Sequence, residues 1–498
     1  MDIETARPDG SLGPLYLAGA LRQIGIEADI VDATVGTEED TLKNTFYRSE
    51  MQTNGLTKIG MPWKRIEEFL GKKQYDIVGI NSNFTPQTNM AFKVAEIAKR
   101  VNPQTLVIAG GVNTRNLWPR FLKQGSFDMI CTTEGEKPIQ EIVRRFMSGE
   151  TYENINGTIY FSEGRPLVSR AKPDTAFADL DKLPIPAWDK LPFEKYERIA
   201  SPHGVDLTGK QYRYAPVMTS RGCPFQCTYC HISQERFGRG ELSGDIGNLR
   251  LKSVPRVIQE IDVLRSLGVK KLFLEDDSLL AKKPRTREIF TLIRDYDLTI
   301  AGVNGVNLVH IFARTKDGTL EPDSDYLQLF YDSGFRQIVC PVESGSQRIL
   351  DKYATAKLNL GTMDVVKLIR MMHEIGIICP VNMMIGFPDE TEEEMMMSVE
   401  LAQKLIDAGA DYVTFFIPIP FPGSALFNIA LAERHIPLDF DTDVFNWKRP
   451  VMTSTTVAPE RIEEIRDWAW RTVNPPEHVA KRLQESIGHR WNPATTSD

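Results

Sequence analysis

Positions 219 to 230 of the chain read Thr219-Ser220-Arg221-Gly222-Cys223-Pro224-Phe225-Gln226-Cys227-Thr228-Tyr229-Cys230, a stretch that holds half of the six cysteines. The three cysteines have the spacing C-x3-C-x2-C. Cubane iron–sulfur clusters are bound by cysteine thiolates, usually four of them. Three thiolates leave one iron atom without a protein ligand, where a chelating substrate can bind. We therefore predict that Cys223, Cys227 and Cys230 bind a [4Fe-4S] cluster.

Two other interpretations of these cysteines are a structural zinc site and three unlinked thiols. A structural zinc ion takes four ligands, commonly from paired Cys-x2-Cys spacings. His231 could be the fourth ligand, but it follows Cys230 directly and is badly placed to bind the same ion. Six cysteines in 498 residues do not suggest a disulfide framework, which favours a reducing, cytoplasmic location.

Strand-like apolar runs surround the cysteines, and amphipathic helical patterns separate most of them. The runs cover residues 216–219, 271–274, 300–306, 337–342, 378–385 and 412–418. Ser253 and Gly268 bound one expected helix, Thr391 and Glu394 form a capping box at another, and Gly376 ends a third. Six parallel strands with outer helices predict a partial (β/α)6 barrel over residues 211–435. In barrels of this kind, functional residues lie at the carboxyl ends of the strands.

The cysteine spacing, with the aromatic Tyr229 before the last cysteine, is similar to the signature of the radical SAM superfamily. The resemblance covers roughly residues 210–425 and implies that S-adenosylmethionine (SAM) binds at the cluster. The second barrel strand ends in Glu275, Asp276 and Asp277. Carboxylates suit an ammonium group, and in the family this position resembles the motif that binds the amino group of SAM. A solvated acidic turn is the alternative.

Two further segments support the resemblance. Glu343-Ser344-Gly345-Ser346 resembles the Glu-Ser-Gly motif of cobalamin-linked radical SAM members, which implies that Glu343 and Ser344 lie near the ribose and methionine parts of SAM. Asn382 and Gly386 fall in a segment that lies along the adenine in the family, where glycine permits close approach of the backbone. We interpret the Met383-Met384 pair as core packing. Cys131, Cys340 and Cys379 lie in expected strands and are interpreted as buried thiols.

The first 150 residues alternate strand and helix patterns, which predicts a doubly wound, Rossmann-like parallel sheet. Expected strands cover residues 27–32, 76–80, 105–109 and 127–131, and expected helices cover 15–23, 88–100 and 138–147. An open sheet of this kind normally begins with a central strand. Only residues 1–5 are available for it, so either that strand is very short or the natural start lies upstream.

Three strand ends of this region resemble those of cobalamin-binding domains. The segment 76–86, with Asn81 and Thr85, resembles their third strand, and Gly110-Gly111 with Asn113 resembles the turn after their fourth. Thr133-Glu134-Gly135-Glu136 resembles the Gly-Glu-Gly-Glu segment of cobalamin-dependent radical SAM enzymes. A Gly-Gly pair after a strand is often only a turn. In this order, before this barrel, the three segments imply that residues 1–150 bind cobalamin.

The histidines depart from the best-known cobalamin domains, which supply a histidine to cobalt after the first strand. The chain has seven histidines and the first is His203, so residues 1–202 contain none. We therefore expect base-off cobalamin without a histidine ligand, its lower face open, hydrated or covered by another side chain. A weak lower ligand would favour low-coordinate cobalt that can be remethylated.

The remaining segments carry weaker signals. Residues 151–210 include a proline-rich run, 179–188, and are expected to form a connector. Residues 436–498 are expected to form a cap of helices and loops, with Trp447, Trp468, Trp470 and Trp491. The net charge of -8 argues against non-specific nucleic-acid binding. The most apolar stretch, 412–421, is too short to cross a bilayer, and the start lacks a signal-peptide pattern.

The whole chain resembles the class B, cobalamin-dependent radical SAM methyltransferases. The resemblance implies that a 5′-deoxyadenosyl radical takes hydrogen from an unactivated carbon of a small, natural-product-type substrate, which then receives methyl from methylcobalamin. An electron donor such as flavodoxin or ferredoxin is expected as a partner. Two alternatives stay open: the same cofactors could drive a rearrangement or cyclisation, or the chain could be a corrinoid carrier or sensor without catalysis. The carboxylates near the cluster argue against a carrier, which has no use for SAM.

Overall fold

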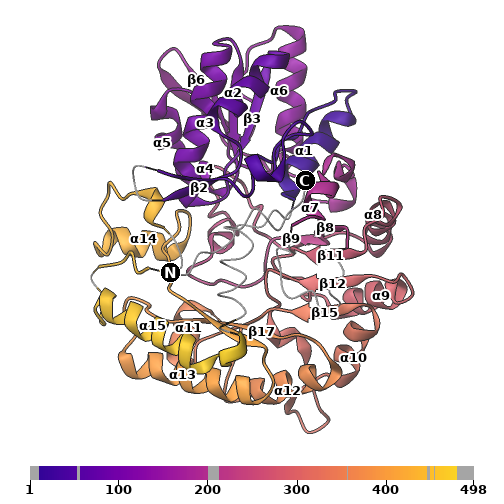
Figure 1. Ribbon diagram of the computed structural model, residues 1–498, viewed down its shortest axis with the longest axis vertical. Coiled ribbons are helices and arrows are strands. Elements are labelled where there is room, and N and C mark those ends of the chain that lie inside the picture. Colours follow the sequence, from indigo (N-terminus) through magenta and orange to yellow (C-terminus); the bar gives the residue numbers. More distant parts are fainter. Residues whose placement is uncertain are drawn as a thin grey trace.

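The computed structural model describes residues 10–52, 56–199, 212–355, 357–445, 449–453, 455–478 and 480. In Figure 1 the N-terminal part, indigo to purple, lies over an arc of strands whose outer side is covered by helices. The strand expected at residues 1–5 lies outside the described residues, as do Trp447 and Trp491 of the tail.

The N-terminal sheet has five strands in the order β3-β4-β5-β6-β7. The first three are parallel, and β6 and β7 extend the sheet as an antiparallel hairpin. Its strands are β3 Ile77–Asn81, β4 Leu106–Gly110, β5 Met129–Cys131, β6 Thr158–Ser162 and β7 Arg165–Ser169. Its helices are α1 Leu12–Arg22, α2 Trp63–Lys73, α3 Thr88–Val101, α4 Val112–Asn116, α5 Trp118–Gln124 and α6 Glu136–Ser148, and β1 Ser49–Met51 pairs with β2 Thr57–Ile59.

The strand expected at residues 27–32 does not form. In this segment the carboxylate of Asp29 accepts hydrogen bonds from Tyr75 and Lys73, at 2.6 and 2.7 Å, so side chains rather than a strand ladder hold it. The hairpin β6–β7 lies where the sequence indicated a loose connector. Farther along that connector the Trp188 side chain is fully buried and donates to the carbonyl of Pro216 at 2.9 Å.

The six expected barrel strands are all present and parallel. They form the sheets β15-β12-β11-β8 and β16-β17-β18, which a bridge between Gln337 and Ile378 joins into one arc. The fourth expected strand is divided into β15 and β16. The bounds are β8 Tyr214–Val217, β11 Lys271–Leu274, β12 Thr299–Gly302, β15 Phe335–Ile338, β16 Cys340–Glu343, β17 Pro380–Met384 and β18 Tyr412–Phe416.

Helices line the outside of the arc (Figure 1), and their caps follow the sequence signals. The Ser253 hydroxyl caps α8, Thr391 and Glu394 form the capping box of α13, and Gly376 ends α12 in the left-handed conformation. The helices are α7 Phe193–Tyr196, α8 Val254–Ser266, α9 Lys283–Ile293, α10 Ser324–Asp332, α11 Gln347–Tyr353, α12 Val365–Ile375 and α13 Glu392–Asp407. Two short antiparallel pairs are formed by β9 Ser220–Arg221 with β10 Arg250–Leu251, across the cysteine loop, and by β13 Phe312–Arg314 with β14 Leu320–Pro322.

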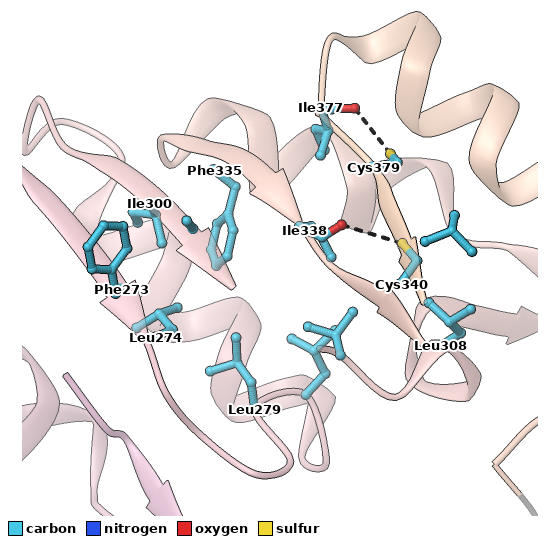
Figure 2. Packing of buried hydrophobic residues seen from close by; sticks show 14 of the residues in the cluster. Phe273, Leu274, Leu279, Ile300, Leu308, Phe335, Ile338, Cys340, Ile377 and Cys379 are labelled. Atoms are coloured by element: carbon cyan, nitrogen blue, oxygen red, sulfur yellow. Dashed lines mark hydrogen bonds between the residues drawn. The ribbon is translucent and has the colours of Figure 1, made fainter. Parts of the chain in front are cut away.

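Apolar side chains of neighbouring strands pack with one another and with those of the surrounding helices in one core (Figure 2). The thiols of Cys340 and Cys379 lie in this core and donate to the carbonyls of Ile338 and Ile377, at 3.5 and 3.1 Å. Cys131 is buried as well, so all three cysteines outside the motif are the buried thiols that the sequence predicted. Met383 is fully buried, whereas Met384 is only partly so.

The C-terminal segments close the molecule in two places. Helix α14, Ala425–Ala432, and the residues after it share one apolar core with the N-terminal sheet. Helix α15, Pro459–Val473, packs beside β18, and the side-chain amide of Asn474 donates to and accepts from the backbone of Val413. This amide occupies hydrogen-bonding groups of an edge strand. In the described part of the chain, no helix has the length and apolarity needed to span a membrane.

Candidate functional site

The cysteine loop leaves β8 and β9 and is held by backbone hydrogen bonds. The amide of Cys223 donates to Gly247 at 3.2 Å, and that of Thr228 donates to Tyr353 at 2.9 Å. Gly222 has φ +79°, and a Cβ there would collide with the carbonyl oxygens of Gly247 and Asn248. The turn before the first cysteine therefore requires glycine.

The three thiols are free and lie within electrostatic range of one another. Cys223 and Cys227 are buried and Cys230 is half-buried. Burial raises the pKa of each thiol, to about 12 for Cys230, and the ammonium of Lys357 acts on all three in the opposite direction. A bound cation or cluster would stabilise the thiolates.

This donor set fits an iron–sulfur cluster better than it fits one zinc ion. Among the described residues, no group of three or more His, Cys, Asp or Glu side chains is arranged to hold a single metal ion. A cubane binds each thiolate through a different iron atom, so its ligands need not converge on one point. His231 is half-buried near Glu235 and Arg115, and its partial removal from water lowers its pKa.

The carboxylates at the end of β11 have different surroundings. Asp276 is buried and accepts hydrogen bonds from the Thr219 amide at 3.0 Å, the Thr219 hydroxyl at 2.7 Å and the Ser220 hydroxyl at 2.5 Å. These bonds tie β11 to the start of the cysteine loop, so Asp276 has the surroundings of a structural residue. The prediction that it binds the SAM amino group finds no support in this geometry.

Asp277 faces the cysteines, while Glu275 is partly exposed. The Asp277 carboxylate accepts the Gly222 amide at 3.2 Å, and burial together with the neighbouring Asp276 raises its pKa to about 6. It is the member of the acidic triplet best placed to meet a cation at the cluster.

Glu343, Tyr229 and Lys357 form a cluster beside the cysteine loop, in which Glu343 is buried and the other two are partly buried. The Tyr229 hydroxyl donates to Glu343 at 2.8 Å, and the Lys357 ammonium lies 3.2 Å from the same carboxylate oxygen. Glu343 has φ +71°, a conformation that costs a non-glycine residue about 1–3 kcal/mol and often marks a functional site. Burial works against the charge of Lys357, but Glu343, Cys227 and Cys230 raise its pKa above the ordinary value.

The other residues predicted to contact SAM differ in exposure. Ser344 is fully buried and pairs with Ser398 of α13 at 3.3 Å, so its hydroxyl has a structural partner. Asn382 is half-buried in β17, and no hydrogen bond of its side chain is found among the described residues. Gly386 has φ +96°, and a Cβ there would lie 2.6 Å from Ile462 of α15. Packing against the tail helix α15 therefore requires a glycine at position 386, which the sequence did not reveal.

The candidate corrin-binding residues lie at the carboxyl ends of β3 and β4, where parallel sheets bind ligands. Asn81 is exposed and donates to the Ser11 hydroxyl at 3.1 Å, and the nearby Phe84 is 53% exposed. Thr85 is buried at the start of a single 3-10 turn. The expectation of base-off cobalamin rests on the absence of histidine from residues 1–202 and stays a prediction.

Gly110, Gly111 and Asn113 brace these strand ends. The Gly110 carbonyl accepts the Ser82 amide at 2.8 Å, and Gly111 has φ +109° with no room for a Cβ beside Ser82. The buried Asn113 amide donates to the hydroxyls of Ser82 and Thr88, both at 3.0 Å. The exposed edge that they support therefore consists of Asn81, Asn83 and Phe84 rather than of Asn113 itself.

Glu134 and Gly135 have an arrangement that sequence reasoning missed. Glu134 forms ion pairs with Arg221 at 2.9 Å and with Arg250 at 3.0 Å, and Arg221 also binds Glu136 at 2.6 Å. Arg221 and Arg250 belong to β9 and β10, which carry the cysteine loop. Gly135 lies where a Cβ would approach Leu17 of α1 to 2.9 Å. The Glu134 segment thus joins the N-terminal sheet to the cysteine loop.

A second polar contact crosses the same boundary. Arg115 of α4 forms an ion pair with Glu235 at 2.6 Å, directly after the short helix His231–Gln234 that follows the cysteines. The turns after β4 and β5 therefore both touch the cysteine loop. No sequence signal pointed to Arg115, Arg221 or Lys357, because each acts on residues far away along the chain.

Sequence comparisons match the N-terminal and the central part of the chain to known domain families. The profile of the Radical SAM superfamily matches residues 217–402, and that of the B12 binding domain matches residues 10–143. An uncharacterised methyltransferase of Pyrococcus horikoshii is 29% identical over 87% of this chain and 88% of its own length. The cytidylyl-2-hydroxyethylphosphonate methyltransferase of Streptomyces wedmorensis is 26% identical over 85% of this chain and 78% of its own length.

Solved structures share the fold. The cobalamin-dependent SAM radical enzyme OxsB, with aqua-cobalamin and SAM bound, superposes with a TM-score of 0.67 at 16% identity, covering 97% of this chain and 69% of OxsB. The radical SAM methyltransferase TsrM of Kitasatospora setae, with tryptophan and a SAM analogue bound, gives 0.63 at 15% identity, covering 93% of this chain and 81% of TsrM.

The chain is thus a radical SAM protein with an N-terminal B12-binding domain. Within that class its sequence and fold are similar to those of the cobalamin-dependent radical SAM methyltransferases. A [4Fe-4S] cluster, SAM and cobalamin are accordingly its cofactors, as the sequence predicted.

Proposed function

We propose that this protein methylates an unactivated carbon of a small molecule of natural-product type. The observation that carries the proposal is the contact between the turns after β4 and β5 and the cysteine loop, through Arg115–Glu235 and Glu134–Arg221. This contact joins the turns after β4 and β5, where the corrin would bind, to the loop that would hold the cluster. A substrate held between them would face both reactive groups.

When bound, the cluster and SAM supply a carbon-centred radical oxidant, and cobalamin supplies the methyl group. Cys223, Cys227 and Cys230 would hold the cluster. Asp277 and Glu343 offer carboxylates to SAM, and Asn382 offers a half-buried amide. Asn81 and Phe84 lie at the edge that would meet the corrin. We assign no general base, because this reaction class requires no protein nucleophile.

The names of two relatives support a small-molecule substrate: one methylates a cytidylylated phosphonate, and the other was solved with tryptophan. We further propose a flavodoxin or ferredoxin as electron donor and a cytoplasmic location. A second candidate function is ring formation with the same cofactors. The anaerobic magnesium-protoporphyrin IX monomethyl ester cyclase of Rubrivivax gelatinosus, 26% identical over 81% of this chain and 65% of its own length, favours it.

The first experiment separates an enzyme from a carrier without needing the substrate. Anaerobically reconstituted protein, SAM and dithionite should yield 5′-deoxyadenosine, and Cys227→Ala should abolish the yield. Cys340→Ala removes a buried thiol outside the motif and should retain it. If the unmodified protein forms no 5′-deoxyadenosine with any reductant, the corrinoid-carrier interpretation replaces ours.

The second experiment distinguishes methylation from cyclisation. The protein is incubated with SAM deuterated at the methyl group and with small molecules made by the enzymes of neighbouring biosynthetic genes, and the product masses are measured by mass spectrometry. Gain of a labelled methyl group in place of hydrogen supports the proposal. Loss of two hydrogens without added carbon supports the cyclase function instead.

A further inference from the structure

Lys357 is a cation held beside the cluster-binding cysteines that neither the sequence motifs nor the proposed function uses. It follows helix α11, and its side chain is only 15% exposed. Its ammonium lies 3.2 Å from Glu343 and 5.8 Å from the centre of the Tyr229 ring. Tyr229 stands directly before Cys230, so the ammonium, paired with Glu343 of β16, also lies beside the cysteine loop.

The other charges that act on the thiols are negative. Asp277 acts on Cys223 and Cys230, and Glu343 acts on Cys227, whereas Lys357 acts on all three. An ammonium at this position is costly to bury without a partner, and Glu343 is its ion-pair partner at 3.2 Å. The position of the Lys357 ammonium is suited to an electrostatic interaction with the cluster that the cysteines would bind.

We propose that Lys357 raises the reduction potential of the [4Fe-4S] cluster by stabilising its reduced state. The reduced cluster carries one more negative charge than the oxidised cluster. A fixed cation nearby therefore lowers the free energy of the reduced form more than that of the oxidised form. The inference rests on the cluster and not on the methyl transfer proposed above.

The sign of the effect can be tested from both partners of the ion pair. Lys357→Met removes the cation and leaves Glu343 negative, so the midpoint potential should become more negative. Lys357→Arg keeps the charge and should restore the potential towards the original value. Glu343→Gln removes the negative partner and should shift the potential in the positive direction. General damage to the site would not give shifts of opposite sign.

The experiment is a redox titration of the anaerobically reconstituted protein, followed by the paramagnetic signal of the reduced cluster, with iron and sulfide content measured for each variant. Lys367→Met is the matched control, because Lys367 pairs with Glu321 at 2.5 Å but is exposed. Its potential should equal that of the unmodified protein. SAM-binding constants are measured in parallel.

The inference is overturned if Lys357→Met retains its cluster and titrates like the control, or if it changes only the affinity for SAM. If Lys357→Met fails to hold the cluster, the Glu343→Gln variant provides the test. A midpoint potential of Glu343→Gln that does not rise above that of the unmodified protein rejects the inference. In every one of these cases the unmodified protein still forms 5′-deoxyadenosine, so failure here is distinguishable from failure of the proposed function.

Discussion

Asp276 and Asp277 are neighbours in sequence, yet their carboxylates meet different groups. Asp276 is enclosed by hydrogen-bond donors of Thr219 and Ser220, whereas Asp277 receives one backbone amide and faces the cysteines. The acidic motif therefore combines a residue that builds the loop with one that is open to a ligand. The sequence could not separate them, because the motif is defined by position and not by burial.

Substitution should reveal this difference. Asp276→Ala leaves buried donors of Thr219 and Ser220 without an acceptor, at about 1–3 kcal/mol for each group. We expect it to lower the free energy of unfolding by about 3 kcal/mol or more and to reduce iron incorporation. Asp277→Ala should keep the stability and weaken SAM binding. Anaerobic urea denaturation and equilibrium dialysis with SAM measure the two effects, and equal stability losses would contradict this distinction.

Glu390 gives a pH-dependent prediction. Its carboxylate is fully buried, one oxygen accepts the amides of Gly386 and Phe387, and the other has no partner among the described residues. Burial raises the pKa of Glu390 to about 8 from the ordinary 4.5. Between these values the folded state binds more protons than the unfolded state, so stability falls as pH rises, by at most about 1.4 kcal/mol per pH unit.

Glu390→Gln, which cannot ionise, should remove this decline. Melting temperatures of the two proteins should therefore converge in mild acid and diverge in mild base, with the variant melting higher. Glu393→Gln changes an exposed carboxylate three residues farther along, in the first turn of α13, and should keep the original pH slope. Parallel pH profiles for Glu390→Gln and the unmodified protein would show that Glu390 does not titrate in this range.

At the scale of elements, the cysteine loop depends on backbone space. Gly222 and Gly238 have nearly the same φ, +79° and +77°, but Gly222 touches two carbonyl oxygens and Gly238 has open space around it. Gly222→Ala should therefore abolish cluster incorporation, whereas Gly238→Ala costs only the backbone strain of about 1–2 kcal/mol. Iron and sulfide content after reconstitution compares them, and equal cluster loading would reject a steric requirement.

Sequence periodicity located most elements, because the barrel strands are short apolar runs between capped helices. Caps such as Ser253 and Thr391 act within one turn and can be identified locally. The division of the fourth strand at Val339 and the hairpin β6–β7 escaped prediction, because strand pairing is decided by partners far away in sequence. The segment 27–32 showed strand-like residues, but Asp29 is held by side chains of α2 and Tyr75 instead.

Only those residues of the candidate site that lie in sequence motifs could be predicted. The cysteines were found by their spacing, and Glu343 and Asp277 by resemblance to family motifs at strand ends; the structure brings these residues together. Lys357 lies outside the motifs, and its role depends on an ion pair with Glu343 that no local pattern encodes. The sequence predicted that Gly386 lets a ligand approach the backbone, whereas the structure places Ile462 of the tail helix against it.

At the scale of the molecule, buried ion pairs hold the B12-binding domain against the barrel. The side chains of Arg221, Arg250 and Glu134 are each 13% exposed, so their charges depend on one another. Burial alone would raise the pKa of Glu134, but the two arginines lower it below its usual range. The carboxylate therefore stays ionised at the domain boundary.

Removing one member of this group should destabilise the whole chain. Glu134→Gln leaves two arginines without full compensation, which for buried pairs costs about 3–5 kcal/mol. We expect a lower melting temperature by scanning calorimetry. Arg170→Gln is the matched control, because Arg170 pairs with Glu241 across the same boundary at 3.6 Å but both side chains are largely exposed. Equal melting temperatures for both variants would show that the buried pairs contribute little.

The pairing of Glu134 with Arg221 and Arg250 also has a consequence for recombination between relatives. If the B12-binding domain were exchanged at the connector, the turn that contains Glu134 would come from the other protein. It would then lie against the original Arg221 of β9 and Arg250 of β10. A functional chimera should therefore carry residues 220–251 together with its donor corrin domain. The segment that is exchanged as a unit is then the B12-binding domain together with the first loop of the barrel. The crossover point lies inside the radical SAM domain and not in the connector between the two domains.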